Sequence, residues 1–575
     1  MSSLPPADSN RPELELLVRR WNLPEERRAS VLELLAAQDK GGTACPLPSD
    51  APTDPSRWGT AAQLIPKPGV GNSVTPTPLL LCREGDVTYL QSWRFFQAES
   101  TIAAHLLARA TRPAPSLIKT ADDLLSLLGD NEINARQREA IARALGKSLT
   151  IITGGPGTGK THTLARLLAL LLIDQPNARP IIRLAAPTGK AADRMRDAIK
   201  IAIAGIGEKF ASIASELSRA AAGACTLHTL LGFNSGTGRC RYNEETPLSC
   251  HVLILDECSM VDTLLWRSLL TALPPATRLI LLGDPNQLES VEAGDVLGTL
   301  VRSDRSGQPS PLEPVWVELT ESMRFNKRVA IGELASAIVQ RKINDAKSLL
   351  ERNELLSDLD VAPLHGLVWL GEHQNRFRWE TLPNVVRQAL AAVGTANTPE
   401  AGLAALDCVR VLTAHREHGM GAAGLNAAIQ KHLEKEFGPT RKPNQPIIIN
   451  RNDPETGLKN GSVGLLMDCN GVRTAFFPGA AGGPNITQFV ISQLPDYSPA
   501  WAMTIHRSQG SEFKHVVVVL PIETSPLATC ELVYTAITRT QECAYVWGSL
   551  TTMEKALESR PRRGSLLEQR LRDAI

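Results

Sequence analysis

The stretch Ile151–Thr163 reads Ile-Ile-Thr-Gly-Gly-Pro-Gly-Thr-Gly-Lys-Thr-His-Thr, a short apolar run followed by a glycine-rich loop. Its residues have the spacing G-x-x-x-x-G-K-[ST], in which backbone N–H groups surround the phosphates of a nucleoside triphosphate. Lys160 then reaches the β and γ oxygens, and Thr161 binds Mg²⁺. Residues 149–153 have the pattern of a buried strand, and residues 163–173 that of an amphipathic helix. This context predicts a nucleotide-binding loop rather than a chance glycine-rich turn.

Length, charge and cysteine content limit the class of protein. The 575 residues exceed a single core and indicate several domains. The formal net charge is +1, so any basic track for nucleic acid must be local. The ten cysteines include no C-x-x-C pair, which favours reduced thiols over a zinc site. The sequence contains no run of about 18 apolar residues and no N-terminal signal pattern. We therefore expect a cytoplasmic protein without a membrane partner.

The N-terminal part reads as a domain without a catalytic motif. Residues 13–39 have a helical apolar pattern, whereas prolines recur through residues 43–79 and predict a loop or linker there. Composition leaves a role in partner docking open. Two strands and a helix are expected next, at residues 79–82, 87–90 and 91–112. The helix carries an aromatic trio that fits a core better than a ligand platform, namely Trp93, Phe95 and Phe96.

Later strands of the first half end in polar residues. The apolar run before Asp256 and Glu257 is typical of a parallel strand. Asp256 is placed to hold Mg²⁺ and Glu257 to accept a proton from the attacking water. The alternative, an acidic helix cap, does not compete downstream of a phosphate loop. The strand at residues 278–284 leads to Gln287, whose amide can sense the γ-phosphate. Residues 181–190 repeat the strand-then-helix order of a parallel sheet covered on both faces.

Three further features of this half are less specific. Phe233–Tyr242 has a glycine-rich centre and aromatic ends, which favours a protruding β-hairpin, with a disordered loop as the alternative. His228 is by default a satisfied structural histidine. Gln137 lies at the start of a helix before the phosphate-loop strand, where it either caps that helix or is solvated.

The second half alternates strand and helix without a phosphate loop, which predicts a second α/β lobe. Residues 446–495 are rich in short β runs and turns, and they indicate a small barrel inserted into that lobe. Arg324 and Arg539 are candidate arginine fingers. An ordinary surface arginine is the alternative for each.

Together these motifs resemble those of the superfamily 1 helicases, and their wording resembles the RecD family, which supplies the alpha subunit of exonuclease V. Residues 450–461 look like part of the SH3-like insertion of that family. The segments that look like motifs I, Ia, II, III, IV, V and VI are, in order, Gly154–Thr163, Ala185–Lys190, Leu255–Met260, Leu282–Leu288, Leu319–Phe325, Trp501–Phe513 and Val533–Thr540.

The resemblance implies a role for each matching residue. Gln137 would read adenine, Asp256 and Glu257 would serve as metal ligand and base, and Phe233–Tyr242 would separate the strands. Gln287 would be the sensor, with Arg324 and Arg539 as fingers. The loop that holds ATP and Mg²⁺ would consist of Gly154, Gly155, Pro156, Gly157, Thr158, Gly159, Lys160, Thr161 and His162. The contacts to single-stranded DNA would be Pro187, Thr188, His228, Thr504, His506 and Ser508.

The implied fold is α/β, with two RecA-like P-loop lobes built on parallel sheets. We expect a small N-terminal α+β docking domain at 1–115 and lobe 1A at 116–330, with a β-hairpin at about 232–248. Lobe 2A would span 331–575, with an SH3-like β insertion at about 443–495.

The implied function is that of an ATP-dependent 5′–3′ DNA helicase subunit that joins RecB and RecC. Such a complex unwinds double-strand DNA ends for recombinational repair and degrades linear DNA. The first 115 residues lack the helix-hairpin-helix repeats of the longer stand-alone form, so the subunit is favoured. The alternatives are a stand-alone repair helicase and, in a different class, a P-loop ATPase switch without unwinding.

Overall fold

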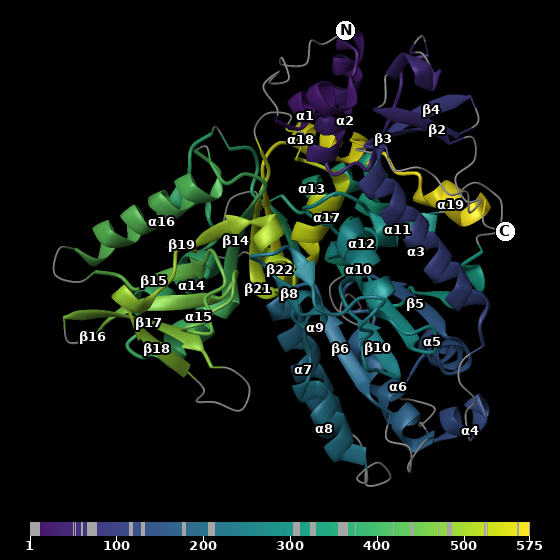
Figure 1. The fold of residues 1–575 in the computed structure, drawn as a ribbon. Helices are drawn as coiled ribbons and strands as arrows, with labels where there is room; N and C mark the ends of the chain where they lie inside the picture. Colours follow the sequence, from purple (N-terminus) through teal and green to yellow (C-terminus); the bar gives the residue numbers. More distant parts are fainter. Residues whose placement is uncertain are drawn as a thin grey trace. The chain divides into compact units, whose positions relative to one another are not determined.

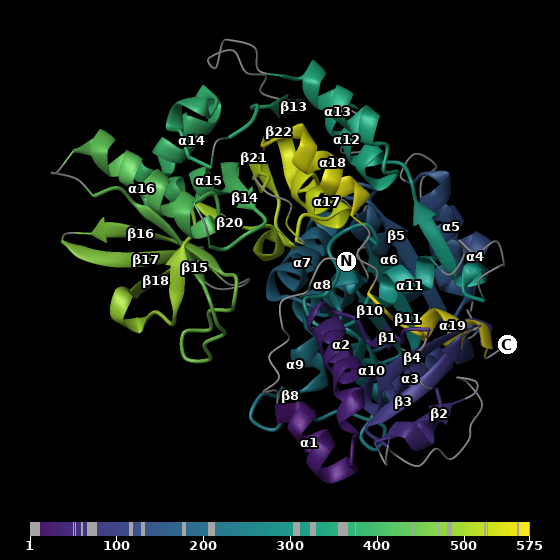
Figure 2. The ribbon, with the colours of Figure 1, turned by 90° about the horizontal axis from the view of Figure 1, so that it is seen from above.

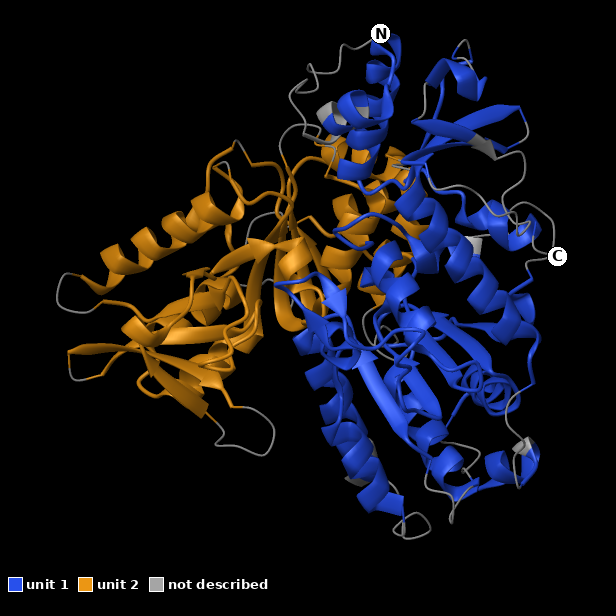
Figure 3. Cartoon of the chain, viewed as in Figure 1, with its two compact units in different colours: residues 1–285, 289–321, 562–575 blue, residues 286–288, 322–561 orange. Residues whose placement is uncertain are grey.

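The computed structural model describes residues 12–573 apart from 50, 52, 59–60, 66–76, 85, 114–118, 128–132, 175–179, 205–212, 303–310, 323–328, 355–365, 374, 418, 439–441, 470, 480–485, 522–524, 526 and 560–562. The chain divides into two compact units (Figure 3). The first comprises residues 1–285, 289–321 and 562–575, and the second comprises residues 286–288 and 322–561. The chain thus changes unit immediately after Leu288, and its C-terminal segment groups with the first unit rather than with the rest of the expected span 331–575.

The first unit is built around a six-stranded parallel sheet (Figure 1). Alternate residues of its strands face two different cores, since Ile151 lies in one core and Ile152 in the other. Burial on both faces explains why these strands read as continuous apolar runs. In sheet order the strands are β12 (Trp316–Leu319), β5 (Leu149–Gly154), β11 (Arg278–Gly283), β10 (Val252–Leu255), β6 (Ile182–Ala186) and β7 (Cys225–Thr226).

Helices cover both faces of this sheet. One core contains residues of α3 (Trp93–Thr111), α9 (Leu227–Leu231), α10 (Thr263–Ala272), α11 (Val296–Arg302) and α19 (Leu567–Asp573). The other contains residues of α4 (Ala121–Ser126), α5 (Ala135–Gly146), α6 (Lys160–Asp174), α7 (Gly189–Ala204) and α8 (Ala214–Ala222). Ile102 and Leu106 of α3 are fully buried in the first core, so this helix is part of the lobe although it precedes the expected boundary at residue 115.

The N-terminal residues form a four-stranded sheet beside two helices. The structure corrects the prediction of a loop or linker over 43–79, because two short strands lie within that stretch. Both are edge strands of the sheet, where a proline such as Pro46 interrupts no central ladder. In the aromatic trio, Phe95 is buried, and Trp93 and Phe96 stack on each other and pack against a small core. The elements are α1 (Pro12–Trp21), α2 (Arg28–Asp39), β1 (Ala44–Pro46), β2 (Ala62–Ile65), β3 (Leu79–Glu84) and β4 (Val87–Ser92).

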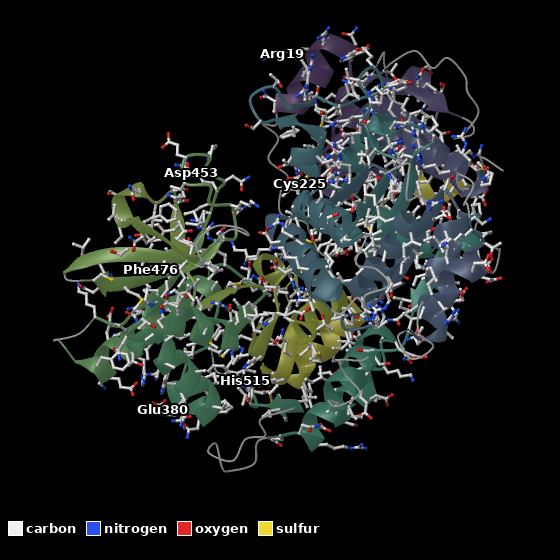
Figure 4. The ribbon with its side chains drawn as sticks, turned by 90° about the horizontal axis from the view of Figure 1, so that it is seen from below. Arg19, Cys225, Glu380, Asp453, Phe476 and His515 are labelled. Carbon is white, nitrogen blue, oxygen red and sulfur yellow. The ribbon has the colours of Figure 1, made fainter. Side chains whose placement is uncertain are left out.

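The second unit has its own parallel sheet of five strands, and Figure 4 marks His515 on its β21. In order the strands are β13 (Gly366–Trp369), β22 (Thr540–Trp547), β21 (Phe513–Val519), β14 (Val409–Thr413) and β20 (Ala502–Thr504). One core includes α12 (Val329–Val339), α13 (Ile343–Arg352), α17 (Cys530–Thr538) and α18 (Leu550–Glu558). The other includes α14 (Asn384–Thr395), α15 (Pro399–Cys408) and α16 (Ala422–Phe437). The predicted α/β class with two parallel-sheet lobes is confirmed.

An antiparallel sheet is inserted between β14 and β20 of this second lobe. It has five strands in the order β18-β17-β16-β15-β19. Figure 2 shows strands β15 to β18 beside α15 and α16. Among the described residues, β18 and β19 are the two edge strands of this sheet and do not pair with each other, so the strands do not close into a barrel. The SH3-like class of the insertion stays a prediction. The strands are β15 (Gln445–Ile449), β16 (Val463–Cys469), β17 (Val472–Pro478), β18 (Ile486–Val490) and β19 (Tyr497–Pro499).

Candidate nucleotide-binding and DNA-binding site

The glycines of the phosphate loop are required by its own geometry. The loop links the end of β5 to the start of α6. Gly157 and Gly159 have φ angles of +78° and +85°, which side chains disfavour. A Cβ on Gly159 would lie 2.3 Å from the Gln137 amide nitrogen, and one on Gly154 would lie 2.8 Å from the Leu319 carbonyl oxygen of β12. The loop therefore fits against its neighbours only without side chains at these positions.

Lys160 places a positive charge on the loop. Its Nζ donates to the carbonyl oxygens of Gly154, at 2.5 Å, and Gly155, at 3.1 Å. The Thr158 hydroxyl also donates to Gly155 O, at 2.8 Å. The side chain of Lys160 is half-buried, as is that of Thr161. This ammonium group and the adjacent start of α6 suit an anionic phosphate, which is the fit expected of a nucleotide loop.

Gln137 has two structural partners. Its side-chain oxygen accepts from Asn134 N at 3.0 Å, and Asn134 Oδ1 accepts from Gln137 N at 2.8 Å, so the two residues form a capping box at the start of α5. Its amide nitrogen donates to Thr158 O of the phosphate loop at 3.3 Å. The capping interpretation is confirmed and the solvated one is wrong, because only 5% of the residue is exposed. Contact with adenine stays a prediction.

The acidic pair lies at the carboxyl end of β10. Asp256 Oδ1 accepts from Glu257 N at 2.8 Å. The pKa of the Asp256 carboxyl is raised to about 6, chiefly by desolvation and also by the negative charge of Glu257, while the positive charge of Lys160 acts to lower it. Glu257 has a left-handed φ of +52°, a conformation that costs about 1–2 kcal/mol in a non-glycine residue. A carboxyl whose ionised form is disfavoured, placed beside a second carboxyl, is a site that a divalent cation would stabilise.

The candidate sensor and one candidate finger contact each other. Gln287 is buried in the second unit, where its Oε1 accepts from Nη2 of Arg539 at 2.7 Å. The neighbouring Leu288 N donates to the Thr535 hydroxyl at 2.9 Å, and Leu288 O accepts from Gln509 Nε2 at 3.1 Å. Arg539 is thus a buried, hydrogen-bonded residue and not an ordinary surface arginine. Thr535 and Gln509 lie in the segments that resemble motifs VI and V, but no role is expected for either from the sequence, and both are more than 200 residues from this loop.

Arg324, the other candidate finger, lies outside the described residues.

The predicted DNA contacts of the first unit come together at one edge of its sheet. Thr188 follows β6, and His228 follows β7, whose Cys225 is marked in Figure 4. Because these strands are adjacent and parallel, their carboxyl ends meet at the same edge. Pro187 and Thr188 are half-buried, and the Thr188 hydroxyl accepts from Ala191 N at 3.2 Å as a cap of α7.

His228 is an exposed residue beside a hairpin. Its ring lies edge-on to Phe233, with the ring centroids 5.1 Å apart, so a core histidine is not what the structure shows. Phe233 begins β8 (Phe233–Asn234), which pairs antiparallel with β9 (Arg239–Cys240). The β-hairpin is therefore confirmed over the disordered alternative. Its role as a strand-separating pin stays a prediction.

The predicted DNA contacts of the second unit follow β20. Thr504 and His506 are half-buried. Ser508 differs, because it is fully buried and its hydroxyl donates to Ile505 O at 2.6 Å, which is a structural role in this conformation. Arg507, to which the sequence pattern assigns no role, donates to Asn450 Oδ1 at 2.9 Å and so connects this segment to the end of β15.

Comparison with known proteins decides the family. Residues 137–293 match the model of an AAA domain, and residues 499–547 match a UvrD-like helicase C-terminal domain. The RecBCD enzyme subunit RecD of Mycobacterium tuberculosis is 35% identical over 534 residues, which cover 90% of this chain and 85% of that protein. The same subunit of Haemophilus influenzae is 34% identical over 76% of this chain and 72% of its own length. This chain belongs to the RecD family.

It is therefore an ATP-dependent DNA helicase of the RecD type, and its phosphate loop is a nucleotide site. The ATP-dependent RecD2 DNA helicase of Deinococcus radiodurans is 29% identical, over 76% of this chain and 52% of that protein. A crystal structure of Bacteroides Pif1 bound to single-stranded DNA covers 74% of this chain and 94% of its own, with 17% identity and a TM-score of 0.39. No helix among the described residues is long and apolar enough to cross a membrane.

Proposed function

We propose that this chain is the 5′–3′ helicase subunit of a complex with RecB and RecC, in which it unwinds double-strand DNA ends for recombinational repair and degradation of linear DNA. The observation that carries the proposal is sequence identity over the shared region. The chain is 35% identical to the Mycobacterium tuberculosis RecD subunit over 534 residues, but 29% identical to the Deinococcus radiodurans RecD2 helicase over 453 residues. The subunit form is therefore favoured over the stand-alone form.

The proposed nucleotide chemistry uses residues that follow two strands of the first unit's parallel sheet, β5 and β10. Lys160 would neutralise the β and γ phosphates, and Glu257 would orient the attacking water and accept its proton. Thr161 and Asp256 would hold Mg²⁺, whose charge offsets that of the phosphates during transfer. The raised pKa of Asp256 fits this role, because a bound cation favours the carboxylate that the protein alone disfavours. Gln287 and Arg539 would respond to the γ-phosphate through the bond they share.

The proposed DNA track begins with the residues that follow β6 and β7. Thr188 and the exposed His228 would contact the strand, and Phe233 at the base of the hairpin extends the same edge. Thr504 and His506 would provide contacts from the second unit. The alternative of an ATPase switch without unwinding gains no support, because the family to which the chain belongs consists of DNA helicases.

Polarity is tested with tailed duplexes and the purified chain. We expect unwinding of a duplex that carries a 5′ single-stranded tail, and none of the same duplex with a 3′ tail. A strand-displacement assay with ATP and Mg²⁺ measures both, and a blunt duplex serves as the control. A preference for the 3′ tail would reject the RecD-type polarity.

The partner proposal is tested by purifying the chain from its native host under mild conditions. We expect RecB and RecC to remain bound and to be identified by mass spectrometry. Recovery of the chain alone, with full unwinding activity, would favour the stand-alone helicase.

A further inference from the structure

The loop that follows Gln287 is fastened to the first unit. Its residues 289–294 come directly after the segment 286–288, which groups with the second unit. Within the loop, the Ser290 hydroxyl donates to the carbonyl oxygens of Glu292, at 2.7 Å, and Gly294, at 3.0 Å. The loop thus has a fixed shape of its own. What holds it in place comes from the two ends of the chain.

Arg563, in the C-terminal segment, contacts this loop at three points. Its Nε lies 2.7 Å from Glu289 Oε2, and its Nη1 donates to Glu292 O at 2.9 Å and to Gly294 O at 3.1 Å. Only 19% of each of the two charged side chains is exposed. Because a guanidinium presents several donors in a fixed plane, the contact fixes the loop's orientation as well as its position.

The N-terminal part contacts the same loop through Gly41. We call the contacts of Arg563 and Gly41 with residues 289–294 the clasp. Gly294 N donates to Gly41 O at 2.8 Å. Gly41 has a φ of +86°, and a Cβ there would lie 2.4 Å from Cζ of Arg563. The backbone at residue 41 therefore lies so close to the guanidinium that only glycine fits. Two positions more than 500 residues apart in the sequence are matched to each other around this loop.

A buried polar network anchors the C-terminal segment that carries Arg563. Gly564 O accepts from Thr43 N at 2.7 Å and from Ala44 N at 3.1 Å. On α19, Arg570 Nε lies 3.3 Å from Glu99 Oε2, and both side chains are 1% exposed. Such a pair resists separation, because removing one partner leaves the other charge buried and unpaired. Arg563 is thus held on a rigid base.

We propose that Arg563 is a positioning residue for the Gln287 sensor, and that through it the N-terminal and C-terminal segments set the rate of ATP hydrolysis. Arg563 fixes the chain from Glu289 onward, while Arg539 and Thr535 hold Gln287 and Leu288. Gln287 is two residues before Glu289, the first residue that Arg563 contacts. Loss of the Arg563 contacts would therefore leave the backbone that follows Gln287 less restrained. This inference rests on the proposed role of Gln287.

A double-mutant cycle on the full-length chain tests this proposal. DNA-stimulated ATPase activity is measured for Arg563→Ala, for Gln287→Ala and for the two together. We expect Arg563→Ala to lower kcat by about 10-fold with little change in the KM for ATP, since a small misplacement of a catalytic group costs rate more than binding. In the Gln287→Ala background, Arg563→Ala should have no further effect on kcat, because the group that it positions is already gone.

Two controls separate positioning from loss of fold. Arg572→Ala removes an arginine of the same segment that pairs with Glu568 along α19, and it should leave kcat unchanged. Gly41→Ala should reproduce the loss of kcat, because the added methyl group displaces the Arg563 guanidinium while residue 563 remains arginine. Gly438→Ala is its matched control, since Gly438 has a φ of +72° with nothing within 4 Å of the added Cβ. Arg563→Lys should restore part of kcat.

The outcomes distinguish the clasp from the sensor. Losses that multiply in the double variant, or Gly41→Ala with the same kcat as Gly438→Ala, would overturn the positioning role of Arg563. A normal kcat in Arg563→Ala beside a reduced one in Gln287→Ala would reject the clasp and keep the sensor. A normal kcat in Gln287→Ala would reject the sensor assignment and this inference with it.

Discussion

Replacing Lys160 with alanine is expected to abolish ATP hydrolysis while leaving the chain folded. The ammonium group is the cation of the phosphate loop, and phosphoryl transfer depends on positioning and charge neutralisation. Losing a preorganised group of this kind lowers turnover by about 10³-fold. The side chain is half-buried, and its hydrogen bonds among the described residues go to the carbonyl oxygens of Gly154 and Gly155, so its removal opens no cavity in a core.

Steady-state ATPase assays with saturating single-stranded DNA measure this loss, and thermal unfolding checks the fold. Lys200→Ala is the matched control, because Lys200 is an exposed residue of α7 that pairs with Asp197 one turn earlier. If Lys160→Ala hydrolyses ATP as fast as Lys200→Ala, the phosphate loop takes no part in the reaction. A large fall in the melting temperature would instead indicate that Lys160 holds the loop structure.

Replacing Arg539 with alanine is expected to lower turnover far more than nucleotide binding. An arginine finger stabilises charge that develops only in the transition state and contributes about 10³–10⁵ in rate. In this structure Arg539 Nη2 donates to Gln287 and Nε donates to Thr535 O at 3.2 Å. Arg539→Lys should also be slow, because an ammonium cannot reproduce the planar fork that reaches both.

The measurements are kcat and the affinity for a non-hydrolysable ATP analogue. Arg341→Ala is the control, because Arg341 is likewise held by carbonyl oxygens, those of Leu557 and Ser559, and by Glu531. Its loss should lower the free energy of unfolding without changing kcat. If Arg539→Ala weakens nucleotide affinity and leaves the saturated rate intact, the arginine is a ground-state contact. Arg324→Ala is expected to behave as Arg539→Ala does.

Local patterns were sufficient for most of the elements. Continuous apolar runs predicted β5, β10 and β11, because strands buried on both faces carry no polar alternation. The prediction of a loop or linker over residues 43–79 is wrong, because two short strands lie there. An edge strand tolerates proline because one side of its ladder is unpaired, and whether a strand lies at an edge depends on neighbours that a local pattern does not include.

The sequence by itself determined the nucleotide loop, the acidic pair at the end of β10 and the family, since each depends on residues close together along the chain. Only the tertiary structure decided that Gln287 bonds Arg539, 252 residues away, and that Gly564 bonds Thr43, 521 residues away. It also decided that Gln137 both caps α5 and holds the phosphate loop. Periodicity and spacing describe hydrogen bonds within an element, whereas these contacts arise where buried polar groups must find partners in other parts of the fold.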